Sequence, residues 1–127
     1  MIRCRRLRDK KFAYDVLVVD DERSIAQSTA RVLLPLRAVI AGTLEEAMTA
    51  LEAHVPQVVV CDYFLKGKVA LPLLKLITEK HPGVRRVVYS SYRDPAIRNA
   101  VDFGYADMIV AKPATKEQLL AAVKPPR

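Results

Sequence analysis

VLVVDDE, at residues 16–22, is the stretch that decides the fold. Its first four residues are apolar and mostly Val, and they run directly into three acids. This pattern is typical of a strand that is buried on both faces and ends at a polar edge. Similar apolar runs follow along the chain, with longer amphipathic segments between them. We expect strands at residues 14–19, 37–41, 57–61, 86–89 and 108–111.

The segments between these runs have the spacing of helices. The first, at about residues 23–34, should end near Pro35, because proline cannot continue a helix. Three later helices have caps in the sequence, namely a Thr43–Glu46 capping box, Asp94 followed by Pro95, and a Thr115–Gln118 capping box. The positions expected to face the core are Leu44, Ala47, Met48, Leu51 and Val55 in the second helix, Ala70, Leu73, Leu74 and Ile77 in the third, and Leu119, Leu120 and Val123 in the fifth.

This unbroken alternation of strands and helices predicts an α/β fold. Parallel strands need a helix-length connection, and that connection is nearly always right-handed, so helices should cover both faces of the sheet. The expected architecture has three layers, α/β/α, around a five-stranded parallel sheet. Ligands in such sheets bind beyond the carboxyl ends of the strands, which is where functional residues are sought.

The chain of 127 residues fits one domain, and its net charge of +7 is unevenly distributed. Residues 1–14 hold six bases and one acid, which leaves 15 bases and 13 acids in the other 113 residues. We therefore expect a basic, flexible extension at residues 1–13, one domain at residues 14–124, and a tail or the start of a linker at residues 125–127. The extension has the charge to bind nucleic acid, but DNA binding is not expected from the domain itself.

Cysteine usage and hydropathy indicate the cellular setting. Cys4 and Cys61 form neither a disulfide framework nor a metal-ligand spacing, and no apolar run approaches the roughly 20 residues of a membrane span. We expect a cytoplasmic protein that does not engage a membrane. Cys61 is expected in the core, while His54 and His81 are expected at the surface near helix ends.

Chemically active side chains follow four of the five expected strands. Asp20 and Asp21 follow the first, Asp62 the third, Ser90 the fourth and Lys112 the fifth. Like charges about 4 Å apart repel by roughly 4 kcal/mol at an effective dielectric of 20, so the carboxylates need a cation. Mg²⁺ takes a few carboxylates and keeps coordination positions for phosphate oxygens. Beside a lysine and a hydroxyl, this arrangement is suited to phosphoryl transfer.

The motifs VLVVDDE, VVVCDYFL, VVYSS and IVAKP resemble those of the receiver domains of two-component response regulators, in order and in approximate spacing. The resemblance covers residues 14–123. It implies the flavodoxin-like strand order 2-1-3-4-5 and a signalling switch that is not a turnover enzyme. It also implies a sensor histidine kinase or phosphotransfer protein and a downstream effector as partners, with a homodimer as a further possibility.

The resemblance assigns roles to individual residues. Asp62 would accept the phosphoryl group. Asp21, Asp62 and the backbone carbonyl of Phe64 would ligate Mg²⁺, and Asp20 would act mainly through water.

The same resemblance assigns the switching residues. Lys112 would pair with the phosphoryl group, and its bond to Pro113 would be cis. The hydroxyl of Ser90 would move toward the phosphoryl oxygens, and partners would read the resulting change at the fourth and fifth strands and helices.

Several positions depart from the family pattern. Ile109 stands where members often have an aromatic residue, and Lys66 replaces a common proline, so we expect a looser loop there. Phe64 and Tyr92 flank the phosphoryl site, and their bulk is expected to hinder water. We therefore predict a long-lived phosphorylated form, to be tested by cutting both residues to alanine and following its decay.

Other interpretations remain open from the sequence. Asp21 alone could be a helix cap, and Lys112 an ordinary surface lysine. A flavodoxin-like carrier is disfavoured because the acidic DDER loop would repel a flavin phosphate. A Mg²⁺-dependent phosphatase of the haloacid dehalogenase type would need a D-x-D motif, whereas Asp20 and Asp21 are adjacent. A pseudo-receiver that acts only as a docking module is the third alternative.

Overall fold

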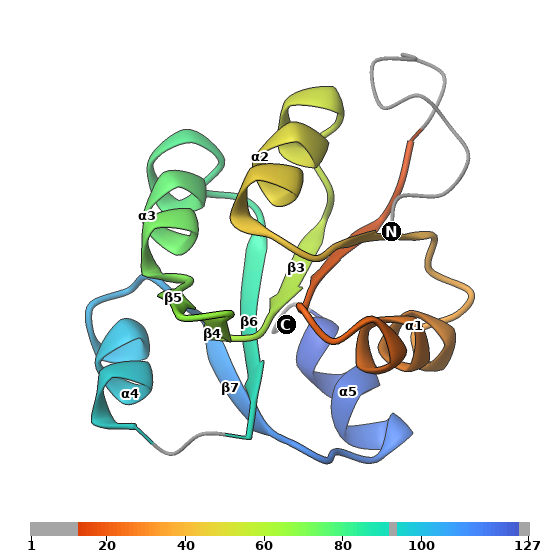
Figure 1. Ribbon diagram of the computed structural model, residues 1–127. Coiled ribbons are helices and arrows are strands. Elements are labelled where there is room, and N and C mark those ends of the chain that lie inside the picture. Colours follow the sequence, from red (N-terminus) through yellow and green to blue (C-terminus); the bar gives the residue numbers. More distant parts are fainter. Residues whose placement is uncertain (1–12, 92–93, 125–127) are drawn as a thin grey trace.

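The computed structural model describes residues 13–91 and 94–124 (Figure 1). Within these residues, a five-stranded parallel sheet has the order β2-β1-β3-β6-β7. Its strands are β1 (Val16–Val19), β2 (Ala38–Ala41), β3 (Val58–Cys61), β6 (Arg85–Ser90) and β7 (Met108–Ala111). Counted along the chain, these strands have the predicted order 2-1-3-4-5, so the fold prediction is confirmed.

Helices cover both faces of this sheet (Figure 1). One face carries α1 (Arg23–Val32) and α5 (Lys116–Val123), and the other carries α2 (Leu44–Ala53), α3 (Leu71–Lys80) and α4 (Pro95–Asp102). Successive residues of one strand serve the two faces: Val16 and Val18 belong to the core cluster under α1 and α5, whereas Leu17 and Val19 belong to the cluster under α2 and α3. This division explains why the central strands are apolar at every position.

Most helix predictions are confirmed. Helix α1 ends at Val32, within the expected margin of Pro35. Asp94 caps α4 by accepting a hydrogen bond from Ala96 N–H, and both hydrogen bonds of the capping box that begins at Thr115 are present.

Two details of α2 differ from the prediction. Thr43 Oγ1 accepts a hydrogen bond from Glu46 N–H at 3.1 Å, but the Glu46 carboxylate accepts one from Gly42 N–H at 2.8 Å, so only half of the expected capping box forms. Val55 was expected on the buried face, but α2 ends at Ala53 and Val55 is 44% exposed. Val55 has the sequence spacing of the buried face, but it lies after the last turn of α2 and therefore does not face the core.

A short hairpin was missed by the sequence analysis. It pairs β4 (Phe64–Leu65) with β5 (Lys68–Val69) in antiparallel fashion. The two residues of its turn have positive φ angles, 46° at Lys66 and 81° at Gly67, as a two-residue turn of type I′ requires. The segment around Lys66 is therefore a paired hairpin, and its expected looseness stays a prediction.

Candidate functional site

Backbone hydrogen bonds fix the candidate residues at the carboxyl edge of the sheet. Asp20 N–H donates to Ala41 O at 3.0 Å, and Asp62 N–H donates to Val19 O at 2.9 Å. On the other side, Lys112 N–H donates to Ser90 O at 3.0 Å. Each residue thus extends the hydrogen bonding of the parallel sheet one step beyond its own strand. Residues far apart in the sequence are brought to one rim by this register.

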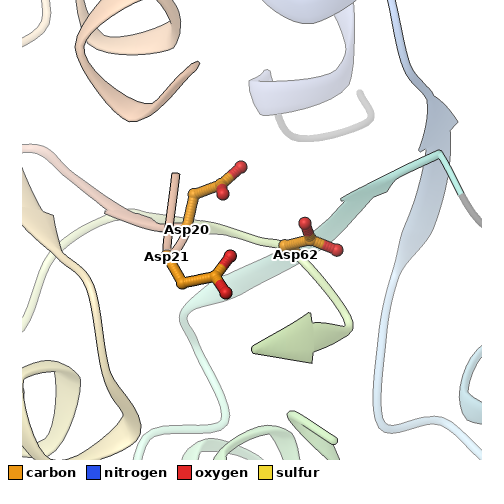
Figure 2. Close-up of side chains that lie close together, drawn as sticks. All are labelled: Asp20, Asp21 and Asp62. Atoms are coloured by element: carbon orange, nitrogen blue, oxygen red, sulfur yellow. The ribbon is translucent and has the colours of Figure 1, made fainter. Parts of the chain in front are cut away.

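Three carboxylates gather at that rim, as Figure 2 shows. Asp20, Asp21 and Asp62 each offer an oxygen within 4.8 Å of the others. Asp20 and Asp62 are buried, at 4% and 7% exposure, and Asp21 is partly buried. The repulsion expected from the sequence is therefore present in a poorly solvated place.

Lys112 bridges two of these carboxylates. Its Nζ lies 2.6 Å from Asp20 Oδ2 and 3.0 Å from Asp62 Oδ2, and its side chain is 9% exposed. Burial opposes the charge on the ammonium group, but the hydrogen bonds to Asp20 and Asp62 outweigh it and raise the pKa of Lys112. The lysine is therefore charged, and the three carboxylates still carry an excess of negative charge.

Backbone N–H groups also orient the carboxylates. Asp20 Oδ1 accepts from Glu22 N–H at 2.9 Å, and Asp62 Oδ1 accepts from Phe64 N–H at 3.3 Å. Asp21 Oδ2 accepts from Lys66 N–H, in the hairpin turn, at 3.0 Å. Helix α1 has Glu22 at its N-cap position, with no side-chain cap hydrogen bond, so Asp21 does not cap this helix.

The other predicted site residues lie around this cluster. Ser90 ends β6 and is 2% exposed. Phe64 begins β4, and its ring makes an edge contact with the ring of Tyr63, with centroids 5.1 Å apart. The bond between Lys112 and Pro113 is cis, as predicted. Tyr92 lies outside the described residues, so the predicted long-lived phosphorylated form stays a prediction.

A cavity of about 530 Å³ opens beside Asp20 and Asp21. It is lined by Asp20, Asp21, Arg23, Ile40, Gly42, Thr43, Glu46 and Lys66. Oxygen ligands, an excess of negative charge and adjoining open space together suit a hard divalent cation such as Mg²⁺. The residues present therefore fit the expected ion.

The residues expected to lie in the core or near helix ends are found there. Cys61 is fully buried, and burial together with the neighbouring Asp62 raises the pKa of its thiol. His54 and His81 are the C-cap residues of α2 and α3. No helix among the described residues is long and apolar enough to cross a membrane.

Contacts made by two residues near the site, Lys66 and Tyr89, were missed by the sequence analysis. The hydrogen bond from Lys66 to Asp21 depends on the hairpin, whose sequence signal is a Lys-Gly pair directly after Phe64 and Leu65. Tyr89 contacts the segment after β7 twice: its ring lies under Lys112 Nζ, and its hydroxyl accepts a hydrogen bond from Ala114 N–H. The sequence shows only an aromatic residue directly before Ser90.

A family model for the response regulator receiver domain matches residues 16–124. The chain belongs to this family. In this receiver domain, the matched residues include all the carboxylates of the cluster as well as Ser90 and Lys112.

A transcriptional regulatory protein is similar in sequence to this receiver domain. The hydrogenase transcriptional regulatory protein HoxA of Cupriavidus necator is 32% identical over 80 residues, which is 62% of this chain and 17% of HoxA. This chain thus spans a small part of the length of that relative.

Two solved structures share the fold of this receiver domain. The receiver domain of NtrX from Brucella abortus is 28% identical with a TM-score of 0.77, and the alignment covers 84% of this chain and 92% of that one. The BeF3-activated receiver domain of DrrB, from Thermotoga maritima, is 25% identical with a TM-score of 0.77, and the alignment covers 88% of this chain and 95% of that one.

Proposed function

We propose that this chain is a phosphorylation-activated signalling switch. It accepts a phosphoryl group from a histidine kinase or a phosphotransfer protein onto Asp62. The observation that carries the proposal is the bridge from Lys112 Nζ to both Asp20 and Asp62, beside the third carboxylate of Asp21. In this arrangement the Asp62 carboxylate supplies a nucleophile, and the Lys112 ammonium group supplies a charge that can neutralise phosphoryl oxygens.

The transfer itself needs little from the protein beyond position and charge. A carboxylate oxygen of Asp62 attacks the phosphorus atom of a phosphohistidine. The new O–P bond forms as the P–N bond breaks, and the bonding pair leaves with the imidazole nitrogen. The Lys112 ammonium group, 3.0 Å from Asp62 Oδ2 before the reaction, pairs with the phosphoryl oxygens afterwards.

Mg²⁺ is the expected cofactor. Asp21, Asp62 and the backbone carbonyl of Phe64 would hold it, with Asp20 acting through water. When bound, the ion supplies charge neutralisation for the phosphoryl oxygens. The hydrogen bond from Lys66 N–H to Oδ2 of Asp21 would orient this carboxylate for the ion.

Signal output is proposed to run through the face formed by β6, α4, β7 and α5. Ser90 and Lys112 are joined across β6 and β7 by the hydrogen bond from Lys112 N–H to Ser90 O. A shift of the Ser90 hydroxyl and of Lys112 toward a new phosphoryl group therefore acts on two neighbouring strands. A downstream effector, or a second copy of the chain, would read the change.

The boundaries and setting of this unit are also proposals. We propose a receiver domain at residues 14–124, a basic N-terminal extension at residues 1–13 and a tail or linker at residues 125–127. We further propose that the domain works in the cytoplasm, where a histidine kinase would present its phosphohistidine.

The decisive experiment uses Mg²⁺ with acetyl phosphate, followed by mass spectrometry of the intact protein. Wild type should gain one phosphoryl group, sensitive to hydroxylamine as an acyl phosphate is, and Asp62→Asn should gain none. Asp107→Asn, a substitution at the opposite edge of the sheet, is the matched control and should be labelled like wild type. Equal labelling of Asp62→Asn, or multiple turnover of a phosphate ester, would contradict the proposal.

Beryllofluoride gives an independent test, because the DrrB receiver domain was solved in a BeF3-activated form. In NMR spectra of wild type, addition of Mg²⁺ and beryllofluoride should shift the amide signals of residues in β6, β7 and α4. Asp62→Asn should show no such shifts. A docking module without phosphoryl chemistry would respond in neither protein.

A further inference from the structure

Tyr89 occupies a special place in the sheet. It lies in β6 directly before Ser90, and it is 8% exposed. Its side chain belongs to the core cluster under α1 and α5, whereas the neighbouring Val88 belongs to the cluster under α4. The ring is therefore fixed by packing on the face of the sheet opposite to α4.

From this place, Tyr89 contacts the segment between β7 and α5 at two points. Lys112 Nζ lies over the tyrosine ring, 5.3 Å from its centroid. The tyrosine hydroxyl accepts a hydrogen bond from Ala114 N–H at 3.3 Å. The segment is irregular, because β7 ends at Ala111 and α5 begins at Lys116. Its two contacts with Tyr89 attach this segment to β6.

The ring contact has the geometry of a cation–π interaction, which is effective within about 6 Å of the ring centroid. The ammonium group is nearly desolvated, since the Lys112 side chain is 9% exposed, and such interactions strengthen when water is excluded. Lys112 is also paired with two carboxylates, Asp20 and Asp62. The fixed ring adds a further constraint that does not depend on either carboxylate.

We infer that Tyr89 is a positioning residue for Lys112: its ring face holds the ammonium group at the carboxylate cluster, and its hydroxyl ties down the following segment at Ala114. The kinetic consequence rests on the proposed function, because Lys112 must reach the phosphoryl group on Asp62. The placement of the ammonium group does not rest on it, and it can be measured in the free protein.

The test compares Tyr89→Leu, which removes ring and hydroxyl, with Tyr89→Phe, which keeps the ring. NMR signals of the Lys112 side chain report ring proximity, because an aromatic face shifts protons above it. Wild type and Tyr89→Phe should show this shift, and Tyr89→Leu should lose it. Lys112→Arg identifies the signal.

The second readout is the rate of phosphorylation by acetyl phosphate with Mg²⁺. Loss of a buried cation–π contact should slow Tyr89→Leu about five- to thirty-fold. Loss of the hydroxyl alone should slow Tyr89→Phe by about two-fold. Val87→Ala is the matched control, because Val87 is buried in the same strand and the same core cluster. It should lower the melting temperature and leave the rate unchanged.

Three results would overturn the inference: an unchanged Lys112 signal in Tyr89→Leu, equal slowing in Tyr89→Phe and Tyr89→Leu, or equal slowing in Val87→Ala. If wild type accepts no phosphoryl group, the proposed function fails. The NMR comparison alone then decides whether Tyr89 positions Lys112.

Discussion

At the amino-terminal edge of the sheet a buried charge has internal partners, whereas at the carboxyl edge three carboxylates gather around one lysine that pairs with only two of them. Arg86 is 7% exposed, and its guanidinium donates to the carbonyls of Val84, Gly104 and Tyr105 and lies 3.8 Å from Asp107. Lys112 pairs with Asp20 and Asp62, whereas Asp21 makes no ion pair with a described residue. The buried guanidinium is paired within the fold, whereas the carboxylate cluster keeps an excess of negative charge that a bound cation can neutralise.

The largest expected effect is at the amino-terminal edge. Arg86→Ala would leave the carbonyls of Val84, Gly104 and Tyr105 without their donor and Asp107 without its cation, and it should lower the free energy of unfolding by about 3 kcal/mol. Urea denaturation measures this change. Arg98→Ala is the control, because the Arg98–Asp102 pair is exposed, and it should cost at most about 0.5 kcal/mol. Similar costs for both variants would contradict the contrast between the two edges.

At the carboxyl edge, the next largest effect should come from Mg²⁺. An ion at a hundred times its dissociation constant stabilises a protein by about 2.7 kcal/mol if it binds only the folded state. Thermal melts with and without Mg²⁺ should show this gain in wild type and lose it in Asp21→Asn. Asp107→Asn should keep the gain, since Asp107 lies at the other edge. A gain that survives in Asp21→Asn would remove this carboxylate from the ligand set.

Alkaline pH should act through Tyr14, whose hydroxyl donates to the carbonyls of Ala50 and His54. Burial raises the pKa of Tyr14 above its ordinary value near 10.0. The neutral phenol therefore stabilises the fold fully below that ordinary value, and the contribution is lost as the pH rises through the raised pKa. Between wild type and Tyr14→Phe, the stability difference should shrink by up to about 1.4 kcal/mol per pH unit above 10. Urea denaturation at several pH values from 9 to 11.5 tests it, and parallel profiles would contradict it.

The smallest effect expected is at the hairpin turn. Lys66→Pro restores the residue common in the family, but proline fixes φ near −65° and has no N–H, whereas Lys66 has a φ of 46° and donates to Asp21. The variant should lose about 1 kcal/mol of stability and part of the Mg²⁺ gain. Lys66→Gly keeps the N–H and accepts positive φ, so it should retain the gain. Mg²⁺ titrations followed by thermal melts compare the two, and equal behaviour would show that the hairpin does not orient Asp21.

The fold was predictable because its signals are local. The apolar runs that became β1 and β3 and the caps at Asp94 and Thr115 are read within a few residues of sequence. The β4–β5 hairpin was missed because strands of two residues have no periodicity. Val55 was misplaced because helical spacing continues past the end of α2, and only the chain's turn toward β3 decides where burial stops.

The membership of the candidate site was predictable for a related reason. Asp20, Asp62, Ser90 and Lys112 stand at strand ends, and parallel strands bring their carboxyl ends to one edge. Tyr89 and Arg86 were not predicted, because an aromatic or basic residue within a strand does not reveal which backbone groups lie opposite to it. Their partners come from the neighbouring strand and its loops.

The sequence by itself determined the alternation of strands and helices and the identity of the side chains at the strand ends, because hydrophobic periodicity and capping act over a few residues. Only the tertiary structure decided which oxygens are already engaged and which remain for a ligand. Lys112 meets Asp20 and Asp62 across 92 and 50 residues of chain. Contacts at such separations depend on sheet register and on the packing of both helical layers, and no local pattern encodes them.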